Sequence, residues 1–386
     1  MRALNLYKRP ILGVVFIAIA GLSLSLPVSA ATNLNTKVIA QGIEYPWGMT
    51  WISDHELLIT EKEVGGWIVD TNTGKKQKVT GWPEDINPDG QGGLLDVLSD
   101  PLFTSNRKLY VSFSHQDRSK GSTTRVASAE LSPDLELVNW TVLFTALPYS
   151  GKVHHYGSRL ALADDNLFIS VGDRGQRHRS QDLSDHAGKI HRINKDGSTP
   201  KDNPFIGMTD NSGKPIPESI YSYGHRNPQG MFIDSQSNIW IHEHGPRGGD
   251  ELNLIQKGKN YGWPIITYGK EYWGPSIGEG THKQGMQQPE YYYVPSIAPS
   301  GLVRYEADLF TEWQGDFLIG ALKGSHLNRL TKASGSSETN QKFEEHRYLE
   351  DLDLRIRDIE VDKEGAIYLL TDEGNGKLIR VMPPLH

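Results

Sequence analysis

A pattern of turns and short strands occurs six times in this chain of 386 residues, and it limits the possible folds more than any other feature. Each copy contains a turn with Gly, Pro or Arg, a short alternating strand, a polar turn and a second apolar strand. The copies begin at residues 45–48, 91–93, 155–157, 227–230, 299–301 and 355–357. Their second strands are expected at residues 56–60, 108–113, 166–171, 238–242, 315–319 and 365–370.

The copies follow one another about every 62 residues, a period typical of β-propeller blades. Such blades close radially and leave few free sheet edges. A solenoid would need a shorter period, and a β-sandwich would not repeat the same turn chemistry six times. We therefore predict an all-β fold, a six-bladed β-propeller with four-stranded antiparallel blades around a central channel, formed by residues 31–386 as one domain.

The composition excludes several other classes of protein. The 40 Gly and 21 Pro indicate a turn-rich chain rather than a helical bundle. The 9 Trp, 16 Tyr and 10 Phe can bury enough surface to exclude a disordered chain. A formal net charge of −7 argues against nucleic acid as a partner, because proteins that bind nucleic acid are normally basic.

Residues 1–30 have the pattern of a secretory signal peptide. Basic residues precede an apolar run over 11–26, and small residues at 28–30 allow cleavage before Ala31. An uncleaved membrane anchor is the alternative, although the run is slightly short for a bilayer span. No later segment is apolar enough for membrane insertion, and the chain has no Cys, so we expect a periplasmic protein without disulfides.

Polar residues stand at four of the six repeat starts, directly before an apolar strand. They are Gln91, His155, Arg226 with Asn227, and Arg355 with Arg357. The loops that enter the innermost strands of a propeller converge on the mouth of its channel. Any one of these residues could simply cap a loop, but together they predict a polar site at that mouth.

Three longer motifs follow the fourth repeat start. They read Tyr-Gly-His-Arg-Asn-Pro-Gln-Gly at 223–230, Glu-His-Gly-Pro-Arg-Gly-Gly-Asp-Glu-Leu-Asn at 243–253 and Asn-Tyr-Gly-Trp-Pro at 260–264. In this order they resemble the soluble pyrroloquinoline-quinone (PQQ) sugar dehydrogenases, and most closely the periplasmic aldose sugar dehydrogenases. The resemblance extends from Pro46 to Gly374 and implies a six-bladed propeller, in agreement with the repeat count.

The resemblance implies PQQ as cofactor. This ligand has three carboxylates and an ortho-quinone, so its site needs fixed cations, planar donors and a Lewis acid. The positions that match the family's cofactor contacts are Gln91, Arg226, Asn227, Tyr272, Ala321, Leu322, Lys323, Arg355, Ile356 and Arg357. Lys323 has no acidic residue within several positions, which favours a ligand role over a local ion pair.

Two of these positions, Arg355 and Arg357, stand two residues apart. On an extended segment both side chains then point to one side, where both could bind the same anionic ligand. Salt bridges to the neighbouring Asp351, Asp353 and Asp358 are the alternative.

By the same resemblance His155 is the general base that takes the proton of the anomeric hydroxyl while hydride passes to the quinone. A neutral imidazole suits this role because its ordinary pKa, about 6.5, lies near operating pH. His154 is the competing candidate, but strand alternation would point only one of the two rings into the site. The motif with Tyr156 and Gly157 selects His155, and Asp173 is a weaker match for a residue that holds the base or the sugar.

Calcium is implied twice. Backbone carbonyls of Gly245 and Pro246 would hold the ion that chelates PQQ, and Glu251 with the backbone of Tyr261 would hold a structural ion. Without the resemblance, residues 248–251 would be interpreted as an ordinary acidic turn. A zinc site at the two histidines of 242–244 is a weak alternative, because a third ligand is missing.

The expected protein is a PQQ- and calcium-dependent dehydrogenase that oxidises the anomeric carbon of mono- or oligosaccharide aldoses to lactones. Its electrons would pass to an external acceptor, since the chain has no Cys for haem attachment. We expect a monomer or a homodimer. A calcium-dependent lactonase and a non-catalytic carbohydrate-binding propeller are the alternatives.

Overall fold

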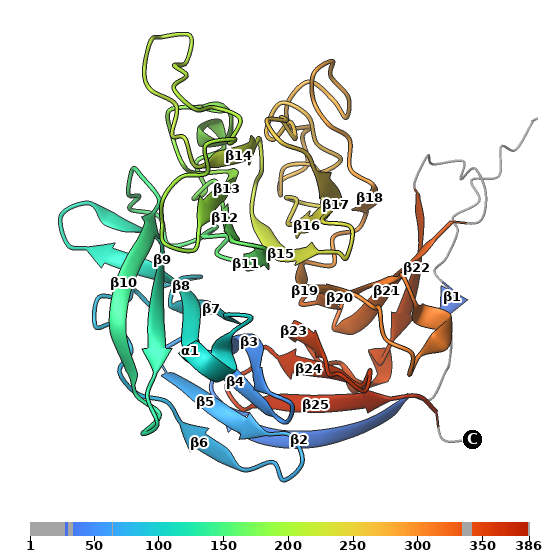
Figure 1. The fold of residues 1–386 in the computed structure, drawn as a ribbon. Helices are drawn as coiled ribbons and strands as arrows, with labels where there is room; N and C mark the ends of the chain where they lie inside the picture. The colour runs from blue at the N-terminus through green and yellow to red at the C-terminus, as the bar shows by residue number, and fades with distance from the viewer. Residues whose placement is uncertain (1–27, 30–33, 64, 334–341, 385–386) are drawn as a thin grey trace, which may run out of the picture.

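The computed structural model describes residues 28–29, 34–63, 65–333 and 342–384. Nearly all regular structure in them is β, in six sheets arranged around a common centre (Figure 1). The predicted six-bladed β-propeller is therefore confirmed. The predicted signal peptide lies outside the described residues except for 28–29.

Each blade is a four-stranded antiparallel sheet whose first strand lies nearest the centre of the ring. The first three blades are β3 (Pro46–Ser53), β4 (Glu56–Glu61), β5 (Gly65–Asp70) and β6 (Lys76–Lys78); β7 (Leu94–Ser99), β8 (Lys108–Asp117), β9 (Gly121–Leu131) and β10 (Leu137–Thr145); β11 (Leu160–Ala163), β12 (Asn166–Val171), β13 (Lys189–Asn194) and β14 (Ile220–Tyr223).

The next two blades have the same order. They are β15 (Pro228–Ile233), β16 (Ile239–Glu243), β17 (Asp250–Ile255) and β18 (Tyr291–Tyr293); β19 (Pro299–Arg304), β20 (Phe317–Ala321), β21 (His326–Lys332) and β22 (Phe343–Tyr348). The short strand β1 (Val28–Ser29) adds to the last of these in parallel.

The sixth blade is built from both ends of the chain, a feature that the repeat pattern does not predict. It consists of β23 (Ile356–Val361), β24 (Ile367–Thr371), β25 (Gly376–Met382) and the early strand β2 (Asn35–Ile43). β2 pairs antiparallel with β25, with Val38 opposite Ile379. This pairing closes the ring, because the last blade takes its outer strand from the start of the propeller.

The core lies between the blades. Apolar side chains of one sheet pack against those of the next, as Leu58 and Ile68 of the first blade do with Val97 and Leu109 of the second. Comparable clusters occupy the other five interfaces between neighbouring blades within the described chain. Within the same residues, no helix is long and apolar enough to cross a membrane.

The start of each inner strand positions the site. Five of the six inner strands in the described chain have a register irregularity in their first residues, at Pro46, Leu94, Pro228, Pro299 and Ile356. Such bulges bend a strand and redirect its side chains. The polar residues at the repeat starts therefore turn toward the channel instead of continuing the alternation of the sheet.

Candidate active site

The inner-strand starts surround a cavity of about 430 Å³ at one end of the central channel. Six of the predicted site residues line it: Gln91, Asn227, Leu322, Lys323, Arg355 and Arg357. Trp47, Tyr156 and His244 supply aromatic walls. Residues from all six repeats thus meet in one place, although the first and last of them, Tyr45 and Asp372, are more than 320 positions apart in the chain.

The lining carries an excess of positive charge. It contains four cationic side chains, those of Lys62, Lys323, Arg355 and Arg357, and one carboxylate, that of Asp372. The ammonium of Lys323 has no hydrogen bond or ion pair to any other described residue. The cavity therefore presents the charge that an anionic ligand requires.

Asp372 takes the place of the aspartates that the sequence suggested as partners of the two arginines. Arg355 donates to Asp372 from Nη2 at 2.6 Å and to the carbonyl of Leu322 at 3.0 Å. Arg357 lies 3.5 Å from the same carboxylate and 3.4 Å from Gln229 Oε1, and its buried Nε has no partner among the described residues. Burial lowers the pKa of Arg357, and the charge of Asp372 opposes this effect.

His155 lies at the edge of the cavity, next to the lining residues Tyr156 and Gly157. Its Nδ1 is 2.7 Å from Asp173 Oδ1, and its backbone N–H donates to Gln91 Oε1 at 2.7 Å. Its Nε2 has no hydrogen bond to another described residue. With Asp173 accepting the proton on Nδ1, the lone pair of the ring lies on Nε2.

The electrostatics favour a neutral imidazole at this position. Burial lowers the pKa of His155; the hydrogen bond to Asp173 opposes this shift, and the charge of Arg226 adds to it. For Asp173, burial raises the pKa, but the contacts with His155 and Arg226 outweigh burial and hold the pKa below its ordinary value. An ionised carboxylate therefore holds a neutral ring, the arrangement of a general base with its orienting acid.

Asp173 is itself fixed by its surroundings. It accepts hydrogen bonds from Gly175 N at 2.7 Å and from Trp263 Nε1 at 2.8 Å in addition to that of His155. Its backbone N–H donates to the carbonyl of Arg226 at 2.8 Å. The sequence motif at 172–175 signalled this residue only weakly, but the structure places it in direct contact with His155.

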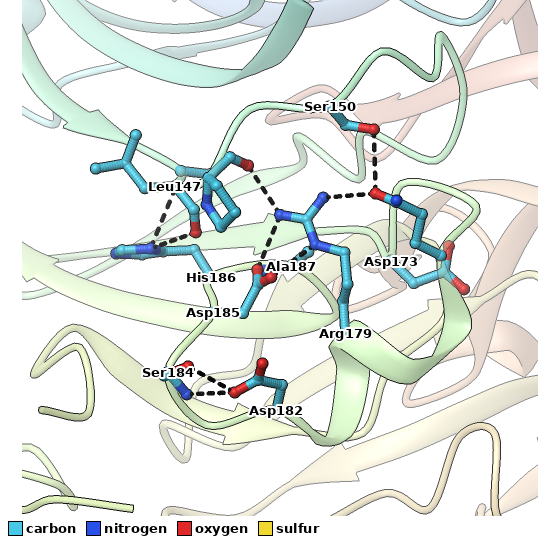
Figure 2. Close-up of polar contacts among 12 residues, drawn as sticks. Leu147, Ser150, Asp173, Arg179, Asp182, Ser184, Asp185, His186 and Ala187 are labelled. Carbon is cyan, nitrogen blue, oxygen red and sulfur yellow. Dashed lines mark hydrogen bonds and ion pairs between the residues drawn. The ribbon is translucent and has the colours of Figure 1, made fainter. Parts of the chain in front are cut away.

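The loop between β12 and β13, which carries Asp173, has its own internal brace (Figure 2). Arg179 forms a double ion pair with Asp185, with N···O distances of 2.7 and 2.9 Å, and also donates to the carbonyl of Pro148 at 2.8 Å. Lys189 is buried and donates to three carbonyls of the same loop, those of Arg179, Asp182 and Ala187. The loop is therefore an ordered platform rather than a free connection.

Arg226 and Asn227 connect this dyad with a second site. Arg226 stacks over Trp263 at 5.4 Å and donates to the carbonyl of His244 at 3.0 Å. Asn227 Oδ1 accepts a hydrogen bond from Gly157 N at 3.2 Å. Arg226 lines a small cavity of about 10 Å³ instead of the central one.

This small cavity gathers three of the four predicted calcium ligands, Gly245, Glu251 and Tyr261. Pro246 is buried next to Gly245 but does not line it. Glu243 faces Glu251 across β16 and β17 and also lines the cavity, a candidate ligand that sequence reasoning missed although it begins the second motif. No group of three or more His, Asp or Glu side chains suited to a metal occurs in the part of the chain that the structure describes.

The carboxylates of this small cavity repel each other. Burial raises the pKa of Glu251 to about 8, and the charge of Glu243 adds to the shift. Glu243 is held by His225 Nδ1 at 2.9 Å and by the backbone N–H of Arg226. A cavity of this size accommodates one water or one ion.

Besides Arg226, three predicted cofactor positions lie outside the lining of the central cavity. Tyr272 is on the surface, with 67% of its area exposed. Ala321 and Ile356 are buried in the apolar clusters on either side of the fifth blade, so only their backbones could face a ligand. Each lies next to lining residues, Leu322 for Ala321 and Arg355 with Arg357 for Ile356.

The alternation argument for the two histidines was wrong. His154 and His155 precede β11 and are not part of a strand, and their rings meet edge to face with centroids 4.9 Å apart. His155 has φ +55°, in the left-handed region, and this turn directs its ring toward Asp173. The contact with Asp173 distinguishes the same ring that the motif with Tyr156 and Gly157 selected.

The fold and this site define a β-propeller with a cationic central cavity and a histidine–aspartate pair at its edge. The profile of the glucose/sorbosone dehydrogenase family matches residues 43–380. The chain belongs to this family, so the predicted family and enzyme class, a sugar dehydrogenase, are confirmed.

Named relatives and solved structures support the assignment to this family. The chain is 39% identical to the aldose sugar dehydrogenase YliI of Escherichia coli, over 92% of this chain and 94% of that protein. It resembles the crystal structure of the soluble aldose sugar dehydrogenase from Escherichia coli in its apo-form, with a TM-score of 0.84, 36% identity and coverage of 91% and 100%. It also resembles the PQQ-bound aldose sugar dehydrogenase of Streptomyces coelicolor, with a TM-score of 0.73, 26% identity and coverage of 92% and 99%.

Proposed function

We propose that this protein is a periplasmic PQQ- and calcium-dependent aldose dehydrogenase that oxidises the anomeric carbon of aldoses to lactones. The observation that carries the proposal is the placement of the His155–Asp173 pair at the edge of a cavity lined by four cations. The printed names of the relatives above, one of them PQQ-bound, support the choice of substrate and cofactor.

The residues of the central cavity fit a tricarboxylate. Arg357 has a buried Nε without a partner, and its other contacts are long, at 3.4 and 3.5 Å. Lys323 has a free ammonium in the described structure. These donors, together with Arg355, would hold the carboxylates of PQQ, while Gln91 and Asn227 would supply neutral hydrogen bonds.

The small cavity fits calcium by the chemistry of its donors. Two carboxylates, those of Glu243 and Glu251, face each other there, and the buried Asn253 Oδ1 nearby has no partner among the described residues. Hard oxygen donors of this kind are the ligands that calcium prefers. The ion at Glu251 and Tyr261 would be structural, whereas a second ion at the carbonyls of Gly245 and Pro246 would supply positive charge beside PQQ. When bound, PQQ would supply the quinone that accepts hydride.

The contribution of the chain to the reaction is the movement of one proton. His155 would accept the proton of the anomeric hydroxyl at Nε2, and Asp173 would stabilise the resulting imidazolium through Nδ1. The lowered pKa of His155 keeps the ring neutral before the substrate binds. Trp263 and Gly175 hold Asp173 in place while the charge develops.

A calcium-dependent lactonase is less well supported. That chemistry needs side-chain carboxylates around a central ion, and Asp372 is the single carboxylate in the lining of the central cavity as described. Asp372 is already paired with Arg355 and Arg357.

One experiment separates the candidates. PQQ and calcium are added to the purified protein, and the absorption of the bound quinone is followed while an aldose is added. A dehydrogenase shows a shifted band that bleaches with the sugar, whereas a lactonase or a carbohydrate-binding protein shows no bleaching. Replacement His155→Ala should keep the shifted band and slow dye-linked oxidation by ~10²- to 10⁴-fold, the range for a general base.

The adjacent histidine provides the matched control. His154→Ala should retain oxidation within about threefold of the unaltered protein, since its ring makes no hydrogen bond to another described residue. Equal losses in both variants would remove His155 from its role.

A further inference from the structure

A buried arginine beside the catalytic pair has no obvious structural purpose. Arg174 is among the largest fully buried side chains, with 1% of its area exposed. No described carboxylate lies within ion-pair distance of its guanidinium, in contrast to Arg179, which pairs with Asp185. Burial without a counter-ion lowers the pKa of Arg174 to about 10, so this position costs free energy that other contacts must offset.

The hydrogen bonds of Arg174 go to the segment that carries His155. Nη1 donates to the carbonyl of His154, and Nη2 donates to the carbonyl of Lys152 at 2.6 Å. The guanidinium also stacks on the ring of Tyr156, 3.4 Å from its centroid. One side chain thus holds the backbone before His155 and the side chain after it.

The two segments also touch through glycines. A Cβ at Gly172 would lie 2.2 Å from the carbonyl oxygen of His155, and one at Gly175 would lie 2.0 Å from Nε2 of His154. The loop at 172–175 therefore packs directly on the backbone of His155 and on the ring of His154. Such close packing transmits a small displacement of one segment to the other.

The segment needs this support because its backbone is in an uncommon conformation. His155 has φ +55°, and Ser158, three residues later, has φ +77°. Left-handed conformations are unfavourable for residues other than Gly and persist when the surrounding contacts enforce them.

We propose that Arg174 is a positioning residue for His155, clamping the backbone of residues 152–156 while its neighbour Asp173 holds the imidazole ring. The inference rests on the proposed role of His155 as the base. Two consecutive residues then divide the task, because Asp173 fixes the tautomer and Arg174 fixes the place from which the ring reaches the substrate. A guanidinium suits this role because its planar donors reach two carbonyls at once, which an ammonium does not do with the same geometry.

The test compares Arg174→Met with Arg174→Lys in the protein loaded with PQQ and calcium. We expect Arg174→Met to lower kcat ~10²-fold with KM for the aldose nearly unchanged, because a misplaced base slows the chemical step without removing substrate contacts. Arg174→Lys should recover about tenfold of this loss, since an ammonium can still donate to one carbonyl.

A second readout does not depend on turnover. In the protein without PQQ, nitrogen NMR of the histidine rings should show His155 with its proton on Nδ1. Arg174→Met should give a mixture of tautomers, because the displaced backbone moves the ring out of hydrogen-bond reach of Asp173. The resonance is assigned by its loss in His155→Gln. The matched control is Arg192→Met, which removes another guanidinium that lies over a tyrosine, Tyr221, in the same blade; the side chain of Arg192 is 12% exposed. This control should leave kcat and the His155 tautomer unchanged.

The proposal is overturned if Arg174→Met matches Arg192→Met in kcat and leaves the His155 tautomer intact. If Arg174→Met does not fold, Arg174→Lys decides by the same two measurements, and wild-type values for both overturn the proposal. If the unaltered protein oxidises no aldose, the proposed function has failed, and the NMR comparison still tests the clamp.

Discussion

The replacement Asp173→Asn tests the proposed catalytic role of the His155–Asp173 pair most directly. Asp173 is 2% exposed and accepts three hydrogen bonds, from His155, Gly175 and Trp263. Asparagine keeps the size of the side chain but removes its charge, and it places an NH₂ group opposite one of the three donors. The imidazolium that forms during proton transfer then loses its counter-ion.

The magnitude follows from these contacts. Loss of a charge-assisted hydrogen bond costs ~1.5–3 kcal/mol, and the conflict between two donors adds ~1 kcal/mol. A total of about 2.5–4 kcal/mol in the transition state lowers kcat by ~10²- to 10³-fold. Because the Asp173 contact raises the pKa of His155, its removal should also move the acid limb of the pH profile to lower pH.

The assay is dye-linked aldose oxidation by the protein loaded with PQQ and calcium, measured as kcat/KM against pH. Asp182→Asn is the matched control, because among the described residues this carboxylate of the same loop bonds only to Ser184 (Figure 2). A kcat for Asp173→Asn equal to that of the control, with an unmoved acid limb, would show that the pair plays no part in proton transfer.

Three further predictions follow from the cavity and the core. Arg357→Met should weaken PQQ binding by ~10- to 10²-fold in a titration of the quinone absorption, because one charged contact is lost; unchanged affinity would contradict the proposed site. At pH 9, above the raised pKa of Glu251, Glu251→Gln should increase the melting temperature of calcium-free protein by relieving the repulsion with Glu243, and should abolish any rise on adding calcium. His242 is fully buried, and burial lowers its pKa to about 3, so the unfolded chain binds more protons between about pH 3 and 6.5 and acidification destabilises the fold. The free energy of unfolding, measured with urea, should be ~2 kcal/mol lower at pH 5 than at pH 7, and His242→Gln should reduce this difference. An equal difference in the variant would show that His242 is not its cause.

The fold was predictable because each repeat start has its own local chemistry. The six inner strands begin where the turns at 45–48, 91–93, 155–157, 227–230, 299–301 and 355–357 lead to them, and the second strands agree closely with β4, β8, β12, β16, β20 and β24. The role of β2 as the closing strand was not predicted, because its partner β25 lies more than 330 residues later. Local patterns carry no information about such a pairing.

The site was predictable in part. Spacing alone placed Arg355 and Arg357 on one side, and both do line the cavity. Their actual partner, Asp372, was not predicted, because it follows the end of the neighbouring strand β24. The aspartates that the sequence suggested are close to the arginines in sequence only. Asp358 instead pairs with Arg159, 3.0 Å away in the channel.

The amino-acid order by itself determined the number of blades, the family and the residue types gathered at the channel mouth, since periodic turns and short motifs are local properties of a chain. The tertiary structure alone decided that Asp173 holds the ring of His155, that Asp372 pairs with the two arginines, and that the buried Arg174 bonds to the segment around His155. These contacts join different blades or loops, and their geometry depends on how the closed ring sets the blades against one another.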